Sequence, residues 1–208
     1  MVKYTLTYFK VRGYAEPIRQ MFKLADVDFE DVRLTYETDW ADYKSKTPFG
    51  QLPVLSVDGF DIPQSVAIAR YVARKFGFAG KTPEEEAWVD ALVDQFKDFT
   101  GPMRSVIMAK KQQKSEADVE KIREEVLKPA METYFNILKK QLEKSKSGFL
   151  VGDSVTFADL TIAENLYSLH NAGFTDLTKE PQLFEFKERI HGLPKLKEWI
   201  ATRPITEF

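Results

Sequence analysis

The chain has 208 residues, of which 43% are hydrophobic and 30% charged, proportions typical of one large or two modest folded domains. Its formal net charge of -2 provides no electrostatic footprint for nucleic acid or an anionic membrane, and we expect neither as a partner. The absence of cysteine excludes disulfides, CxxC redox chemistry, a cysteine nucleophile and thiolate metal sites.

The N-terminal part of the chain predicts alternating strands and helices. Polar and apolar residues alternate over 3–9, as in a strand, and helical spacing of apolar residues follows over 15–26. Further strands are predicted over 29–34 and 52–57, and a fourth strand follows a tight turn at Asp58-Gly59. An amphipathic helix over 64–77 completes the order βαβ-ββα, which implies one parallel crossover and an antiparallel hairpin.

Residues 79–83 interrupt this pattern with glycine and proline, and everything after them has helical periodicity. We predict an α/β domain over 1–78, a linker over 79–83 and an all-helical domain over 84–208. The predicted helices cover 88–109, 117–144 and 157–172, followed by two short C-terminal helices. "SVTFADL" predicts a structural helix start, in which Thr156 caps the helix and Asp159 completes a capping box.

Several apparent motifs carry no chemistry. "GKT" at 80–82 lacks the first glycine of a phosphate loop, because Lys75 stands in its place. The two histidines, His170 and His191, are too few and badly placed for a zinc site, and we expect no metal. The N-terminus has no apolar signal-peptide core and no apolar run is long enough to cross a bilayer, so we expect a cytoplasmic protein.

The order βαβ-ββα resembles the thioredoxin fold, which carries its reactive group in the turn between the first strand and the first helix. Here that turn reads "YFKVRGYAE", with Tyr8 at the end of the strand. Pro53, in "GQLPVL", matches the cis-proline of that fold, where exposed backbone groups can pair with a peptide-like ligand.

Four motifs in sequence resemble the cytosolic glutathione S-transferases, and most closely the sigma class as found in nematodes. They are "YF..RG.AE.IR", "PFGQLPVL", "QSVAIARYVA" and "VTFADL", and the resemblance extends from Met1 to Phe208. It implies a thioredoxin-like domain followed by an α-helical bundle. It also implies a homodimeric glutathione transferase that uses glutathione as co-substrate and needs no further cofactor.

The resemblance implies that Tyr8 is the catalytic residue. The thiol of glutathione has a pKa of about 8.5, so only a small fraction is the nucleophilic thiolate at neutral pH. A hydroxyl that donates to the sulfur lowers that pKa, and a shift of about two units corresponds to roughly 2.7 kcal/mol. A tyrosine at a strand end can also simply cover a core, which is the structural alternative.

The resemblance also assigns the glutathione contacts. Two residues match those that meet the glycyl carboxylate, three match those that hold the glycyl and cysteinyl parts, and two begin a helix that favours the γ-glutamyl carboxylate. One aspartate matches a residue that reaches the γ-glutamyl amine across the dimer. In that order they are Trp40 and Lys44; Gln51, Leu52 and Pro53; Gln64 and Ser65; and Asp98.

The electrophile site is expected at Phe9, Tyr14, Arg104, Thr161, Asn165 and Phe208. Tyr14 departs from the sigma class, which commonly has arginine there beside the catalytic tyrosine. Positions that are bulky and aromatic in vertebrate prostaglandin-H isomerases are small or polar here: Thr100, Ser105, Thr161 and Asn165. We therefore expect broad electrophile tolerance rather than prostaglandin D synthesis, and a pocket wide enough to suggest haem as a ligand.

Conjugation of hydrophobic electrophiles is the leading function, and it belongs to the first of three classes, the enzymes. Hydroperoxide reduction is expected to accompany it, and prostaglandin-H isomerisation is an alternative. A carrier of haem or other hydrophobic ligands is a second class of function. A structural, crystallin-like protein is the third, and it has no need of the residues Tyr8, Gln51, Gln64, Ser65 and Asp98.

Overall fold

The N-terminal part of the chain forms a four-stranded mixed sheet. In the computed structural model, which describes residues 2–206, the strand order is β2-β1-β3-β4. Strand β1 pairs in parallel with β2, and the pairs β1–β3 and β3–β4 are antiparallel. The predicted crossover and hairpin are both present. The strands are β1 (Tyr4–Phe9), β2 (Glu30–Leu34), β3 (Val54–Val57) and β4 (Phe60–Pro63).

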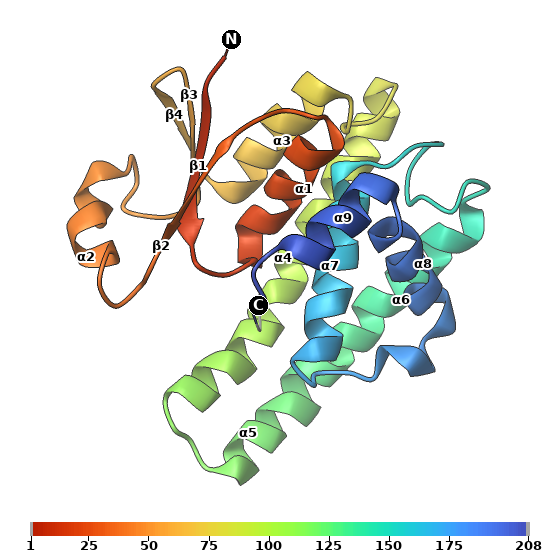
Figure 1. The fold of residues 1–208 in the computed structure, drawn as a ribbon. Coiled ribbons are helices and arrows are strands. Elements are labelled where there is room, and N and C mark those ends of the chain that lie inside the picture. Colours follow the sequence, from red (N-terminus) through yellow and green to blue (C-terminus); the bar gives the residue numbers. More distant parts are fainter. Residues whose placement is uncertain (1, 207–208) are drawn as a thin grey trace.

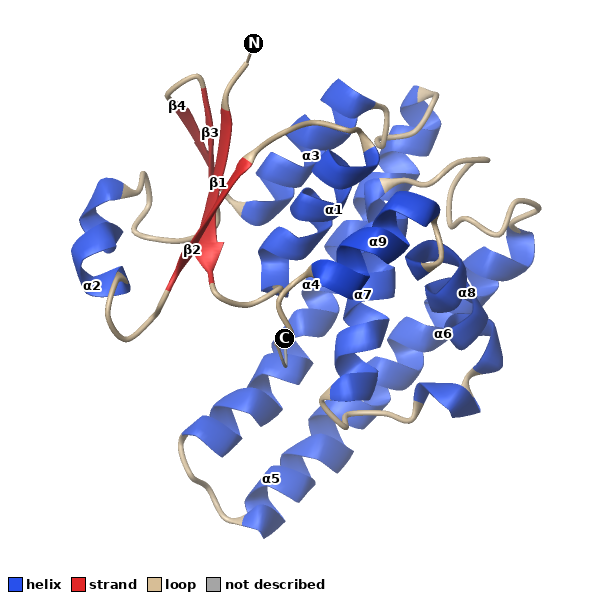
Figure 2. Cartoon of the chain, viewed as in Figure 1, coloured by secondary structure: helices blue, strands red, loops and turns tan. Residues whose placement is uncertain are grey.

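Helices α1 (Glu16–Leu24) and α3 (Ser65–Phe76) cover one face of this sheet, and the short helix α2 (Trp40–Tyr43) lies on the other side (Figures 1 and 2). Ile18 and Phe22 of α1 are fully buried, and the Phe22 ring meets that of Tyr4 on β1, with ring centroids 5.2 Å apart. The sequence did not predict α2 or the 3-10 turn after it. The predicted thioredoxin-like arrangement followed by an all-helical domain is confirmed.

The second domain consists of helices packed beside the α1–α3 layer (Figure 1). Helix α4 starts earlier than the predicted Trp88, because Thr82 accepts a hydrogen bond from the Glu85 N–H and caps it. The predicted helix over 117–144 is helical throughout, but a π-helical turn joins its two halves. The helices are α4 (Pro83–Lys111), α5 (Glu116–Ile122), α6 (Lys128–Lys144), α7 (Phe157–Asn171), α8 (Pro181–His191) and α9 (Pro194–Thr202).

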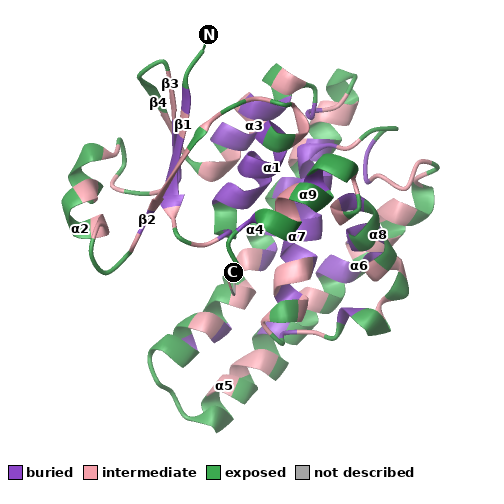
Figure 3. Cartoon of the chain, viewed as in Figure 1, coloured by how far each residue is buried: buried purple, intermediate pink, exposed green. Residues whose placement is uncertain are grey.

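Helix α7 lies at the centre of the molecule, and most of its side chains are buried (Figure 3). The predicted capping box is present: the Thr156 N–H donates to the Asp159 carboxylate at 2.7 Å. The same carboxylate accepts the Leu150 N–H at 2.8 Å, which anchors the loop before the helix. Because α7 contacts α1 as well as α4, it fixes the two domains relative to each other.

No helix among residues 2–206 combines the length and apolar character needed to cross a membrane.

Candidate active site

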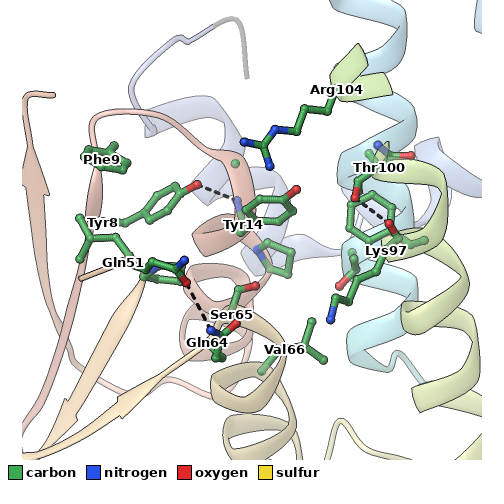
Figure 4. A pocket seen from close by; sticks show the side chains of 18 of the residues that line it. Tyr8, Phe9, Tyr14, Gln51, Gln64, Ser65, Val66, Lys97, Thr100 and Arg104 are labelled. Carbon is green, nitrogen blue, oxygen red and sulfur yellow. Dashed lines mark hydrogen bonds between the residues drawn. The ribbon is translucent and has the colours of Figure 1, made fainter. Parts of the chain in front are cut away.

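A cavity of about 640 Å³ opens between the two domains, within the size range of small-molecule sites. One side, here called the N-terminal wall, comes from the end of β1, the turn after it, the start of α1, residues around α2, and the segments before β3 and α3. The opposite side, here called the helical wall, comes from α4 and α7. Figure 4 shows the two walls facing each other.

Tyr8 projects from the end of β1 into this cavity (Figure 4). Its side chain is only 7% exposed, and its hydroxyl oxygen accepts the Tyr14 N–H at 3.4 Å. Burial raises the pKa of Tyr8 above its ordinary value, although the Tyr14 N–H works in the opposite direction. The hydroxyl therefore keeps its proton at neutral pH and can donate it in a hydrogen bond to a ligand.

Gly13 sets the position of that hydroxyl. Its backbone has a φ of +41°, in the region that favours glycine. A Cβ at this position would lie 2.8 Å from the Tyr8 hydroxyl oxygen and 3.0 Å from Cε1 of the same ring. Only glycine lets the turn pass so close to Tyr8, so the "RG" of the sequence has a steric reason.

Buried charges hold this turn against the helical domain. We call Arg12, Glu16, Arg19, Glu164 and Arg203 the junction cluster; all are at most 7% exposed. Arg12 pairs with Glu164 of α7, and Arg203 bridges Glu16 and Glu164 at 2.9 Å each. Arg19 pairs with Glu16 and also donates to the Val11 carbonyl at 3.0 Å. The cluster thus ties the turn after β1 to α7 and to the C-terminal segment.

The segment before β3 and the start of α3 line the cavity. The Leu52-Pro53 peptide bond is cis, as the sequence predicted. Gln64 has a φ of +73°, unusual for a residue with a side chain, and its amide donates to Gln51 at 3.4 Å. Ser65 begins α3, whose first N–H groups have no partner within the helix and can bind an anion.

Of the remaining predicted glutathione contacts, one lines the cavity and two do not. Trp40 lines the cavity and meets Phe9 edge-on, with ring centroids 5.4 Å apart. Lys44 does not line it, although its stem runs beside the lining residue Gly50. Asp98 is exposed on α4 and lies outside the cavity of this chain. The roles predicted for Lys44 and Asp98 therefore stay predictions.

The predicted electrophile residues Phe9, Tyr14, Arg104, Thr161 and Asn165 all line the cavity, and Thr100 does as well. Ser105 does not; its hydroxyl donates to the Gly101 carbonyl on α4. The Oδ1 atom of Asn165 is buried without a hydrogen-bond partner in residues 2–206. Phe208 falls outside the described residues.

Other lining residues were not predicted. The unpredicted lining residues of α4 recur at successive turns, so counting helical turns from Arg104 would have identified them. Those of the N-terminal wall lie in irregular segments, where no periodicity marks them. The unpredicted residues include Val93, Phe96, Lys97, Met103 and Ile107 on α4, Glu164 and Ser168 on α7, and Gly13, Tyr36 and Phe49 on the N-terminal wall. No cluster of metal-ligating side chains occurs in the described part of the chain.

Comparisons with known proteins match both domains of the chain. Residues 4–74 match the glutathione S-transferase N-terminal domain, and residues 97–203 match a glutathione S-transferase C-terminal domain. The chain is 51% identical to glutathione S-transferase 3 of Caenorhabditis elegans over the full length of both.

Solved structures agree with these matches. A Nu-class glutathione transferase from Haemonchus contortus is 48% identical, covers 100% of both chains and superposes with a TM-score of 0.90. A glutathione transferase from Necator americanus, described as monomeric, is 48% identical and superposes with a TM-score of 0.91. That alignment covers 99% of this chain and 100% of the other.

Proposed function

The chain belongs to the glutathione S-transferase family, and on that premise we propose that the Tyr8 hydroxyl activates the thiol of bound glutathione for attack on hydrophobic electrophiles. The activity of a glutathione transferase is common to its relatives. The role of Tyr8 rests on the geometry of the cavity. Its burial, its orientation into the cavity and its retained proton are the observations that carry the proposal.

The chemistry requires a thiolate at neutral pH. A hydrogen bond from Tyr8 to the sulfur stabilises the charged form, and a shift of about two pKa units raises the thiolate fraction roughly a hundredfold at low pH. The thiol proton leaves to solvent. The sulfur then attacks an electrophilic carbon, a C–S bond forms, and a leaving group such as chloride departs with the electron pair of its bond.

The N-terminal wall offers partners for the rest of the tripeptide. The backbone of Leu52, before cis Pro53, can pair with the cysteinyl part as an added strand would. The first N–H groups of α3, at Ser65, favour the γ-glutamyl carboxylate. We assign Trp40 and Lys44 to the glycyl carboxylate, and Asp98 of a second subunit to the γ-glutamyl amine.

The finer assignments are also proposals. We propose a sigma-type enzyme that acts as a homodimer in the cytoplasm and detoxifies foreign electrophiles. The motifs around Tyr8 and Pro53 support the class, whereas one similar structure is described as Nu-class and another as monomeric.

We also propose hydroperoxide reduction. The thiolate attacks the terminal oxygen of the hydroperoxide, and the alcohol leaves with a proton. A second glutathione then reduces the sulfenic product, which yields glutathione disulfide and water.

The test compares Tyr8→Phe with Tyr134→Phe in conjugation of chlorodinitrobenzene. Tyr134 is also a buried phenol, but it does not line the cavity, and its hydroxyl has no hydrogen-bond partner in the described residues. We expect Tyr8→Phe to lower kcat/KM about a hundredfold below pH 7 and Tyr134→Phe to leave it unchanged. Equal turnover in both variants, or tight haem binding by a wild-type protein without turnover, would contradict the proposal.

A further inference from the structure

The charged side chains that line the cavity are unevenly compensated. They are Glu164, Lys97 and Arg104. Glu164 is buried and already pairs with Arg12 and Arg203 of the junction cluster. Lys97 and Arg104 are exposed, and neither side chain has a hydrogen bond or ion pair within residues 2–206. The cavity therefore presents two uncompensated positive charges to a ligand.

An unpaired arginine is unusual in this chain. Apart from Arg104 and Arg189, every arginine in the described residues makes an ion pair with a carboxylate. Arg189 lies away from the cavity, beside Gly148. Arg104 is thus the one arginine of the described chain that both lines the cavity and lacks a carboxylate partner.

Lys97 and Arg104 serve different ends of the cavity. They are seven residues apart on α4, which places them on one face of the helix and roughly 10 Å apart along its axis. In Figure 4 the Lys97 amino group points toward Ser65 and Val66, while the Arg104 guanidinium points toward Tyr14. Lys97 therefore lies at the glutathione end, and Arg104 lies at the end left for the electrophile.

The surroundings of Arg104 combine this charge with apolar surface. Met103 and Ile107, its neighbours on the helical wall, are half-buried and line the cavity. Tyr14, which is 46% exposed, lines the cavity from the N-terminal wall. A planar guanidinium binds a carboxylate through two parallel hydrogen bonds, which a neutral group of similar shape cannot match.

We propose that Arg104 selects electrophiles that carry a carboxylate on an apolar body. The inference rests on the proposed function and names the substrate class of the same site. Because Arg104 is exposed, its contribution is modest, about a fivefold change in affinity for the charged ligand. Salt weakens the preference, since the interaction is electrostatic.

The test uses chloronitrobenzoate and its methyl ester, which share the arene and the leaving group and differ in charge. Binding is measured by calorimetry on full-length protein saturated with S-methylglutathione, a thioether that cannot attack. The association constants of the acid and the ester give a ratio for each variant. We expect Arg104→Ala to lower the acid-to-ester ratio about fivefold and Arg104→Lys to lower it less.

Lys111→Ala is the matched control, because Lys111 is an exposed, unpaired cation of the same helix outside the cavity. Its ratio should equal that of the wild type, and about 0.5 M salt should shrink the effect of Arg104→Ala. An unchanged ratio in Arg104→Ala overturns the inference. Failure of the proposed function would show separately, as equal conjugation rates in Tyr8→Phe and wild type.

Discussion

The two walls of the cavity place their functional groups in opposite ways. On the N-terminal wall, Gly13 and Gln64 have positive φ values, the peptide bond before Pro53 is cis, and Tyr8 is buried. On the helical wall, the lining residues sit on regular turns of α4 and α7, and the cations of α4 are exposed and unpaired. One wall is built from irregular backbone, the other from side chains on a regular helix.

The difference follows from what each wall contacts. In the function we propose, the N-terminal wall binds glutathione, which is the same in every reaction, and it must place one hydroxyl accurately. The junction cluster and close packing fix its backbone. In the same proposal the helical wall binds electrophiles of different structure, for which exposed side chains on a stable helix can differ without disturbing the fold. Chemistry is therefore fixed on one side and specificity is adjustable on the other.

Removing a buried charge from the junction cluster should have the largest effect on stability. In Glu164→Gln, Arg12 and Arg203 each lose their ion pair with Glu164, although Arg203 keeps its pair with Glu16. We expect the free energy of unfolding to fall by about 3 kcal/mol, because buried charge is left less compensated. Urea denaturation measures it. Asp153→Asn, which breaks an exposed pair with Lys81, is the control and should show no resolvable change. Similar unfolding curves for the two variants would show that the cluster does not fix the wall.

His191, which borders this cluster, should make the fold acid-sensitive. Burial and the nearby charges of Arg203, Lys187 and Arg12 lower its pKa to about 3. Glu164 lies 3.6 Å from its Nε2 atom, but that carboxylate is already compensated by two arginines. His191 resists protonation in the folded protein but not in the unfolded chain, where its pKa is about 6.5. The stability that depends on neutral His191 is therefore fully present above pH 6.5 and is lost as the pH falls toward 3.

At pH 5 this loss amounts to roughly 2 kcal/mol. His191→Gln removes the titrating group, so the variant should lose less stability than the wild type between pH 7 and pH 5. Urea unfolding at several pH values measures the difference. Parallel stability curves for the two proteins would mean that His191 titrates alike in the folded and unfolded chains.

Gly13→Ala should disturb the chemistry more than the fold. The added Cβ meets the Tyr8 hydroxyl at 2.8 Å and requires a strained φ, so we expect about a tenfold loss of kcat/KM. The pH at which conjugation reaches half its maximum should also rise, because a displaced hydroxyl stabilises the thiolate less. Gly101→Ala, in α4 with open space around it, should match the wild type in both respects. An unshifted pH profile in Gly13→Ala would leave Gly13 a purely structural role.

Much of the N-terminal domain could be predicted from the sequence, because its elements are local. The alternation of polar and apolar residues predicted β1, and the Asp58-Gly59 turn predicted the hairpin. The resemblance of the motif around Pro53 predicted the cis bond. Helix α2 could not be predicted, because a helix of four residues is too short to show a periodic pattern of apolar residues.

The junction cluster could not be predicted for a different reason. Arg12 and Glu164 are 152 positions apart, and no spacing rule connects residues whose contact depends on how two domains pack. The face of α4 that lines the cavity could have been predicted, because Lys97, Thr100 and Arg104 lie three or four residues apart on one helix. Arg104 was expected in the site, but its lack of a carboxylate partner emerges only from the structure.

The activation that we propose requires the Tyr8 hydroxyl to lower the pKa of the glutathione thiol. Ultraviolet absorbance of the thiolate, titrated with pH on the protein–glutathione complex, measures that pKa directly. In the wild type we predict a value about two units below the ordinary 8.5 of a thiol, and in Tyr8→Phe a return close to 8.5. Tyr8 itself should not interfere below pH 10, because burial raises its own pKa. The same low thiol pKa in both proteins would show that the Tyr8 hydroxyl does not activate the sulfur.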